Sequence, residues 1–136
     1  MRYVNSIVLL ALSLIALNVQ AVTMVVHPSN ANALNKKAFK KIFLGKSKKF
    51  PDGSKVTPID LTGGDARAQF LESVVGKSES QLKAYWSKLI FTGKGQAPQS
   101  VDSDAEVIAF VSQNPNAIGY ISDDAVNDSV KVAGKF

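Results

Sequence analysis

The sequence predicts an α/β fold, with a small, mainly parallel or mixed sheet flanked by helices. Short runs of β-branched and aliphatic residues alternate along the chain with segments whose apolar residues recur at helical spacing. Gly, Pro and Asn separate these segments, and strands that alternate with helices are typical of α/β layers. Beyond a leader, residues 22–136 suffice for one modest core, so we expect one domain.

The first 21 residues have the pattern of a secretory signal peptide. Arg2 precedes an apolar run over Ile7–Leu17, and Val19-Gln20-Ala21 offers a cleavage site. The run is shorter than the about 20 residues of a membrane-spanning helix, and an uncleaved N-terminal anchor is the alternative. With cleavage after Ala21 we expect a periplasmic protein that is not inserted stably in a membrane. Cys is absent, which excludes disulfides, thiolate chemistry and a lipidated cysteine.

The first elements follow from their boundary residues. A strand over 23–26 should end before Pro28, which lacks an N–H and keeps its neighbour extended. Asn35 can cap a helix that runs through Phe43, with apolar residues on one face and lysines on the other. Gly45 provides the left-handed residue that ends this helix.

The next strand and helix meet at a glycine-containing turn. Val56–Leu61 reads as the second strand, and Thr62-Gly63-Gly64 breaks it. Asp65 can cap the following helix, on which apolar residues recur every four positions until Gly76 closes it.

Two later helices begin with capping-box patterns. Ser78 and Gln81 predict the start of one, and Ser103 and Glu106 the start of the other. The first should bury a stripe composed of Leu82, Tyr85, Trp86, Leu89 and Ile90. A third strand is expected over 118–121, and a possible fourth over 130–133 at an edge of the sheet.

Charge is unevenly distributed along the chain, whose net formal charge is +5. Residues 22–51 contain seven lysines and no acidic residue, whereas residues 96–136 contain six acidic residues and two lysines. A basic first third and an acidic last third predict an electrostatic field across the protein surface, or charge complementarity with another molecule.

The segment Asp60–Arg67 is the first candidate for chemistry. A Gly-containing turn from a strand into a helix directs backbone N–H groups at one point, where the helix dipole favours an anion. Thr62, Gly63, Gly64, Asp65 and Arg67 would form this anion site. The alternative is a capped helix start without a ligand, since Asp65 can occupy the same N–H groups and repel an anion.

The lysines of residues 36–55 are the second candidate. They form either the solvated face of an amphipathic helix or a docking patch for an anionic membrane, a polysaccharide or an acidic protein. Nucleic acid is not an expected partner, because no aromatic residues interleave the lysines and export separates the chain from it.

No residue set supports catalysis, a metal or a cofactor, so we do not expect an enzyme. His27 is the only histidine and has no acidic cluster beside it in the sequence. Asp123 and Asp124 lie in an expected turn, and neither a Gly-x-Ser-x-Gly motif nor a cysteine is present. The Gly93-Lys94-Gly95 loop follows a helix and lacks the spacing of a nucleotide-binding loop.

Three short motifs carry a family resemblance: Ile42-Phe43-Leu44-Gly45-Lys46, Trp86 followed by Phe91-Thr92-Gly93-Lys94-Gly95, and Ala117-Ile118-Gly119-Tyr120. In this order, behind a leader, they resemble one lobe of the phosphate-binding periplasmic proteins of ABC transporters. The resemblance covers Val25 to about Ile121 and implies a single lobe of a type II periplasmic binding protein.

The resemblance also implies where a ligand would lie. In the family an Arg and a Ser-Gly-Thr run hold the anion; here Asp60 stands at the Arg position and Gly64-Asp65-Ala66 at the run. Thr62 and Arg67 are the residues that could compensate. Because residues after the equivalent of the first strand face the cleft in the family, Ser29 and Asn30 join the expected ligand-binding set.

Two functions remain open at this stage. The first is binding of inorganic phosphate or another small anion, linked to ABC-type uptake or sensing through a permease or other envelope protein. The second is a non-transport interaction module of the cell envelope that has kept the lobe and lost ligand binding.

Overall fold

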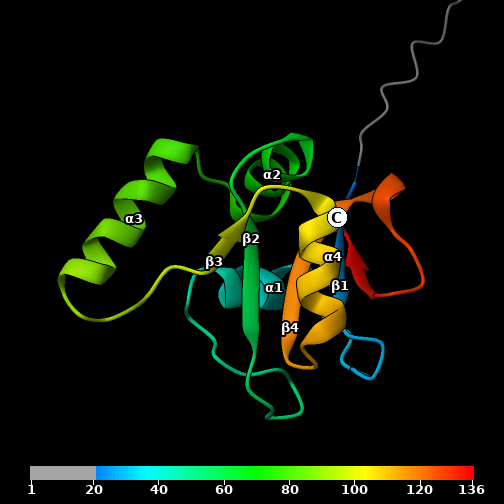
Figure 1. The fold of residues 1–136 in the computed structure, drawn as a ribbon. Coiled ribbons are helices and arrows are strands. Elements are labelled where there is room, and N and C mark those ends of the chain that lie inside the picture. Colours follow the sequence, from blue (N-terminus) through cyan, green and yellow to red (C-terminus); the bar gives the residue numbers. More distant parts are fainter. Residues whose placement is uncertain (1–20) are drawn as a thin grey trace, which may run out of the picture.

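The computed structural model describes residues 21–136 (Figure 1). The predicted signal peptide, and the anchor that is its alternative, lie outside these residues except for Ala21. Within the described part, no helix has the length and apolar character needed to cross a membrane.

A five-stranded sheet forms the centre of the molecule, in the order β3-β2-β4-β1-β5. The strands are β1 (Val22–Val26), β2 (Thr57–Leu61), β3 (Gln99–Val101), β4 (Ala117–Ser122) and β5 (Lys131–Lys135). β2 runs parallel to both β3 and β4, whereas β1 runs antiparallel to β4 and to β5. The sheet is therefore mixed, as predicted, and the predicted last strand does lie at an edge.

The helices are α1 (Lys36–Phe43), α2 (Asp65–Phe70), which continues into the π-helical turn η1 (Leu71–Val75), α3 (Glu79–Phe91) and α4 (Asp104–Gln113). A 3₁₀ turn, η2 (Asp123–Ala125), follows β4. α4 covers one face of the sheet, and α1 and α2 lie on the other (Figure 1).

Adjacent residues of β4 show how the two faces are built. Gly119 faces α4 so closely that a Cβ would lie 2.6 Å from Val107 Cγ1 and 2.9 Å from Ile59 Cγ2. Tyr120 faces the other way, as strand alternation requires, and its ring stacks on Phe70 at 4.0 Å between centroids. Phe43 meets both rings edge-on. The core therefore leaves no room for a side chain at position 119 on one face of β4 and takes a large aromatic one at position 120 on the other.

Most predicted caps are present. Asn35 Oδ1 accepts from the Ala38 N–H, and Ser78 and Gln81 form the reciprocal capping box. Gly45 and Gly76 adopt the left-handed conformation, with φ of 71° and 68°.

Three expectations were wrong in detail, and one strand was not predicted. Gly64, and not Asp65, is the N-cap of α2, and no side chain caps this helix. The Glu106 side chain accepts from the Asp102 N–H and the Ser103 hydroxyl but not from the Ser103 N–H, so the second capping box is only half formed. β3 was not predicted, because its three residues are too few to show a period. Ile90, expected in a buried stripe, is 55% exposed.

The exposure of Ile90 reflects the position of α3. This helix extends beyond the β3 edge of the sheet, away from the other helices (Figure 1). Only Leu82 and Trp86 of α3 are buried, and Phe91 at its end is 93% exposed. A helical stripe is buried only as far as there is a surface to pack against, and the sequence does not show where that surface ends.

Candidate functional site

The predicted anion turn lies where β2 passes into α2. Because β2 and β4 are parallel neighbours, their carboxyl ends lie at the same edge of the sheet. Asp60 near the end of β2 and Tyr120 in β4 are therefore close, and Arg67 on α2 reaches down to both. We call this edge the acidic end.

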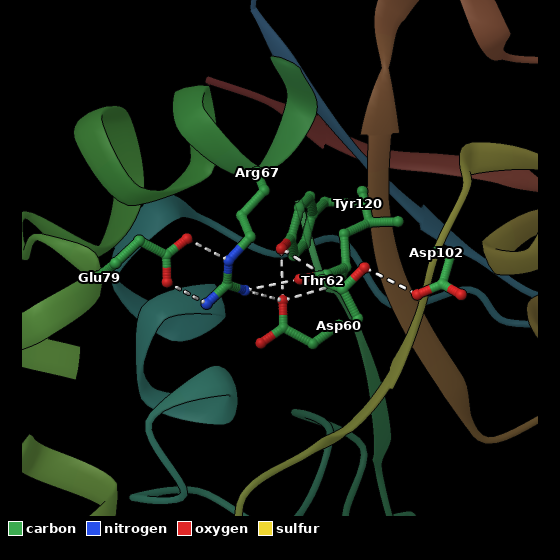
Figure 2. A network of polar contacts seen from close by, with 7 residues as sticks. Asp60, Thr62, Arg67, Glu79, Asp102 and Tyr120 are labelled. Atoms are coloured by element: carbon green, nitrogen blue, oxygen red, sulfur yellow. Dashed lines mark hydrogen bonds and ion pairs between the residues drawn. The ribbon is translucent and has the colours of Figure 1, made fainter. Parts of the chain in front are cut away.

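Arg67 directs four of its five side-chain N–H groups to internal partners (Figure 2). Its Nη1 donates to Asp60 Oδ1 at 2.9 Å and to the Leu61 carbonyl at 2.8 Å. Its Nε and Nη2 donate to the two carboxylate oxygens of Glu79, at 2.6 and 2.9 Å, in a bidentate pair. The guanidinium side chain is 12% exposed. Arg67 thus fixes α3 to the end of β2 and leaves only one Nη2 N–H for an external anion.

Tyr120 of β4 completes the network. Its hydroxyl donates to Asp60 Oδ1, which also accepts from the Leu61 N–H at 2.9 Å. Burial raises the pKa of Tyr120 above its ordinary value, and the neighbouring Asp60 carboxylate adds to this effect. The hydroxyl therefore remains a neutral hydrogen-bond donor across the physiological pH range.

The same contacts shift the pKa values of the two ion-paired residues, Arg67 and Glu79. The hydrogen bonds from Arg67 lower the pKa of Glu79, against a smaller opposing effect of burial. The Glu79 carboxylate in turn raises the pKa of Arg67. Both groups are consequently held in their charged forms, and two carboxylates surround one guanidinium.

The turn itself is open and surrounded by carboxylates. A hollow of about 270 Å³ lies against Gly63, Gly64 and the start of α2. Three aspartates line it: Asp65, Asp102 and Asp104. Thr62 Oγ1 donates to Asp102 Oδ1 at 2.8 Å, so the hydroxyl already has an acceptor (Figure 2).

Ser29 and Asn30 are not near this turn. β1 runs antiparallel to β4, with Val26 opposite Ile118 at the beginning of β4. The residues after β1 therefore lie at the other end of the sheet from Thr62–Asp65. There the Ser29 Oγ lies 2.7 Å from His27 Nδ1, and Asn30 Oδ1 accepts from the backbone and side chain of Asn32. The structure thus divides the predicted ligand set into two separate groups.

The opposite end of the sheet, which we call the lysine end, has the reverse electrostatic character. A hollow of about 420 Å³ lies between α1 and the hairpin around Pro51. A second, of about 230 Å³, lies between the end of α1, the start of β2 and the segment from Trp86 to Pro98. Five lysines line them: Lys37, Lys41, Lys48, Lys49 and Lys55. Within residues 21–136, none of these lysines forms an ion pair.

Sequence reasoning missed Glu79 and Tyr120 as site residues. Glu79 is the first residue of α3 and follows a capping serine, so its carboxylate is typical of a first helical turn and does not by itself indicate a site. Tyr120 belongs to a motif used only for the family resemblance. A polar hydroxyl within an otherwise apolar strand was the available signal, because a buried Tyr O–H requires a partner.

Comparisons with known proteins support the fold. No protein-family model matches the chain, and no curated protein does. Among solved structures, the fold is similar to a putative phosphate ABC transporter substrate-binding protein from Clostridium perfringens, crystallised with bound phosphate. The TM-score is 0.64 with 24% sequence identity over 83% of this chain.

Two further solved structures have the same fold over 83% of this chain. They are an ABC-type phosphate transport receptor from Vibrio cholerae (TM-score 0.63, 18% identity) and PstS from Borrelia burgdorferi (TM-score 0.60, 16% identity). The chain covers 44%, 45% and 46% of the three proteins, less than half of each. The fold is therefore that of a single lobe of such a binding protein, which confirms the predicted fold class.

Proposed function

We propose that this chain is a periplasmic phosphate-binding-like protein, exported with cleavage after Ala21, that binds phosphate or another small anion for ABC-type uptake or sensing. It is a binding protein and not an enzyme in this proposal. The likeness to a lobe of three phosphate-transport proteins, one of them crystallised with phosphate, supports the general kind of function. An ABC permease or another envelope protein is the expected partner.

The observation that carries this proposal is the open turn between β2 and α2. The first N–H groups of a helix lack intrahelical acceptors, and no side chain caps α2. Gly63 and Gly64 are exposed and leave the backbone accessible from the hollow. Oriented N–H groups at such a turn favour an anion.

The charges of the hollow set the expected affinity. Asp65, Asp102 and Asp104 face the same space as the free N–H groups. A like charge at ~4 Å costs about 1 kcal/mol in bulk water and several times more when partly desolvated. We therefore expect weak binding by the isolated lobe and stronger binding where a second surface closes the hollow, since ligand sites normally bury most of their ligand.

Calorimetric titration of phosphate into the purified chain at low salt, with sulfate as the control anion, tests the proposal. We expect saturable phosphate binding that becomes tighter in Asp65→Asn, because this change removes one repelling charge without touching the Arg67 network. Thr62→Ala should weaken binding if the hydroxyl turns from Asp102 to the ligand. Absence of heat in both the parent and Asp65→Asn, with the fold intact, would exclude capture of phosphate by this chain alone.

A second candidate is the envelope interaction module that has lost ligand binding. The occupation of Arg67 by Asp60 and Glu79 favours it, because the nearest guanidinium is neutralised from within. In this case neither phosphate nor sulfate binds to the parent protein or to any of the tested variants. Contact with the partner then involves the acidic hollow or the lysine end.

A further inference from the structure

A cavity separate from the anion turn lies beside Asp60, between β2, β3 and α3. Its volume is about 410 Å³, within the range of small-molecule sites. Leu82, Trp86 and Pro98 give it apolar walls, and Asp60, Ser80 and Ser100 give it polar ones. The phosphate proposal does not involve this space, which we call the Asp60 cavity.

Asp60 presents an unused acceptor to the cavity. All of its hydrogen bonds fall on one oxygen: Oδ1 accepts from Leu61 N, Arg67 Nη1 and the Tyr120 hydroxyl. Within residues 21–136, Oδ2 accepts no hydrogen bond, although Asp60 is only 8% exposed. No fully enclosed side-chain N or O atom in that range lacks a partner, so Oδ2 must reach open space. In Figure 2 this oxygen points away from the network.

Two hydroxyl groups accompany this oxygen. Ser100 is the register partner of Asp60 in the parallel β2–β3 pair, and both residues line the cavity, so the two side chains share one face of the sheet. Ser80 lines the same cavity from α3. Within the described residues, neither hydroxyl forms a hydrogen bond. The cavity therefore has an acceptor and two adaptable hydroxyls without protein partners.

The charges around Oδ2 indicate which ligand fits. Asp60 and Glu79 carry two negative charges and Arg67 one positive charge, so this network has one excess negative charge; within it Asp60 and Arg67 are nearly buried, whereas the Glu79 side chain is 61% exposed. Lys83 lines the rim and is exposed. One cation would neutralise the excess charge, whereas a second cationic centre would be repelled by Lys83 and Arg67.

We propose that the Asp60 cavity binds a small molecule with one ammonium group, which donates to Asp60 Oδ2 and lies beside the Ser100 hydroxyl. A carboxylate–ammonium contact is stronger than a neutral hydrogen bond, and burial of Asp60 increases the difference. The apolar carbons of the amine would lie against Leu82, Trp86 and Pro98. This site takes a cation and is independent of the anion turn of the proposed function.

Amide NMR titration of the purified, isotope-labelled chain with butylammonium chloride tests this proposal, with butanol and butyrate as the neutral and anionic probes of equal length. We expect saturable shifts for Ser80, Ala97 and Ser100 with butylammonium, and binding weaker by about tenfold or more for the other two probes. No saturable shift with butylammonium, or equal binding of all three probes, would overturn the proposal.

Asp60→Asn and Asp65→Asn are the matched variants. In Asp60→Asn the three donors around Oδ1 hold the amide oxygen in place, so the NH₂ group replaces Oδ2 and offers a donor where the ammonium needs an acceptor. We expect about tenfold or greater loss of butylammonium binding. Asp65→Asn, at the same end of the sheet but outside the cavity, should change it less than about twofold.

Ser100→Ala is a second test of the site that remains informative if Asp60→Asn fails to fold. It leaves the ion-pair network intact and should weaken butylammonium binding several-fold by removal of one hydroxyl. Butylammonium shifts that gather at Asp65, Asp102 and Asp104 and are lost in Asp65→Asn would instead show simple attraction to an acidic surface and overturn the proposal.

Discussion

The two ends of the sheet use charge in opposite ways. At the acidic end, Asp60 and Tyr120 are buried, Arg67 is only 12% exposed, and both Arg67 and the Tyr120 hydroxyl donate to one oxygen of Asp60. At the lysine end, the five lysine side chains around the two hollows are exposed and form no ion pair within the described residues. The first end holds α2, α3 and the sheet together, whereas the second presents charge to the surroundings.

This difference separates stability from association. Removal of one partner from a buried charge pair leaves an uncompensated charge and is strongly destabilising. Removal of an exposed charge changes folding little but alters the long-range field that steers a partner. The predictions below test this division, from the largest expected effect to the smallest.

Arg67→Met should cause the largest loss of stability. The change keeps much of the side-chain volume and leaves the carboxylate of Asp60 buried without its cation. We expect a decrease in the free energy of unfolding of about 3–5 kcal/mol, measured by urea denaturation. Lys41→Met, the matched change at the lysine end, should stay within about 0.5 kcal/mol of the parent. Equal losses in the two variants would contradict the comparison.

Tyr120→Phe should produce the next largest effect. It retains the ring that stacks on Phe70 and deletes only the hydroxyl that donates to Asp60. We expect a loss of about 1–3 kcal/mol, because a buried acceptor loses a donor. Tyr85→Phe is the control: its hydroxyl donates to the Leu44 carbonyl at 2.6 Å in a half-buried position, and its loss should cost less. Both are measured by thermal and urea denaturation.

The fold was largely predictable from the sequence, because local signals specify it. Asn35, Gly45, Gly76 and Ser78 occupy the cap positions that their chemistry predicts. The alternation of strands and helices was equally clear. The sequence did not show the direction of β1, since strand direction depends on which strands pair and not on local preference.

The direction of β1 explains why the predicted site was divided. Ser29 and Asn30 follow a strand, and the carboxyl ends of parallel strands meet at one edge of a sheet. β1 is antiparallel, so its carboxyl end lies at the opposite edge from the turn at Thr62. The partnership of Arg67 with Glu79 was hidden for a similar reason: the two residues are brought together by the position of α3, which local patterns do not encode.

Acid should weaken the contact between α2 and α3 before it affects the core. The pKa of Glu79 is lowered by the hydrogen bonds from Arg67, from an ordinary value of 4.5. The pair therefore adds stability above this value, and the contribution is lost as the pH falls through the lowered pKa. Glu79→Gln should be less stable than the parent near neutral pH, and the difference should disappear in acid.

Urea denaturation of the parent and Glu79→Gln across this pH range measures the effect. Because the Glu79 side chain is 61% exposed, we expect a difference of at most about 1 kcal/mol at neutral pH. Asp123→Asn is the control, since the pKa of Asp123 is lowered by a hydrogen bond from Lys135 at the opposite edge of the sheet from α3. Only Glu79→Gln should also shift the amide resonances of α3. If the difference in the free energy of unfolding between the parent and Glu79→Gln persists unchanged in acid, Glu79 contributes through packing and not through its charge.

The triple variant Lys37→Gln, Lys41→Gln and Lys49→Gln should change stability least. These lysines surround a hollow with a partly apolar floor and have no partner carboxylate within the described residues. Their removal lowers mutual repulsion, so the free energy of unfolding should stay equal or rise by a few tenths of a kcal/mol. Retention on a sulfonated cation exchanger should nevertheless decrease, because the positive field of this end weakens. A marked loss of stability would show instead that the lysine stems cover Leu34 and Ile42, and the lysine end would then resemble the acidic end in holding the fold together.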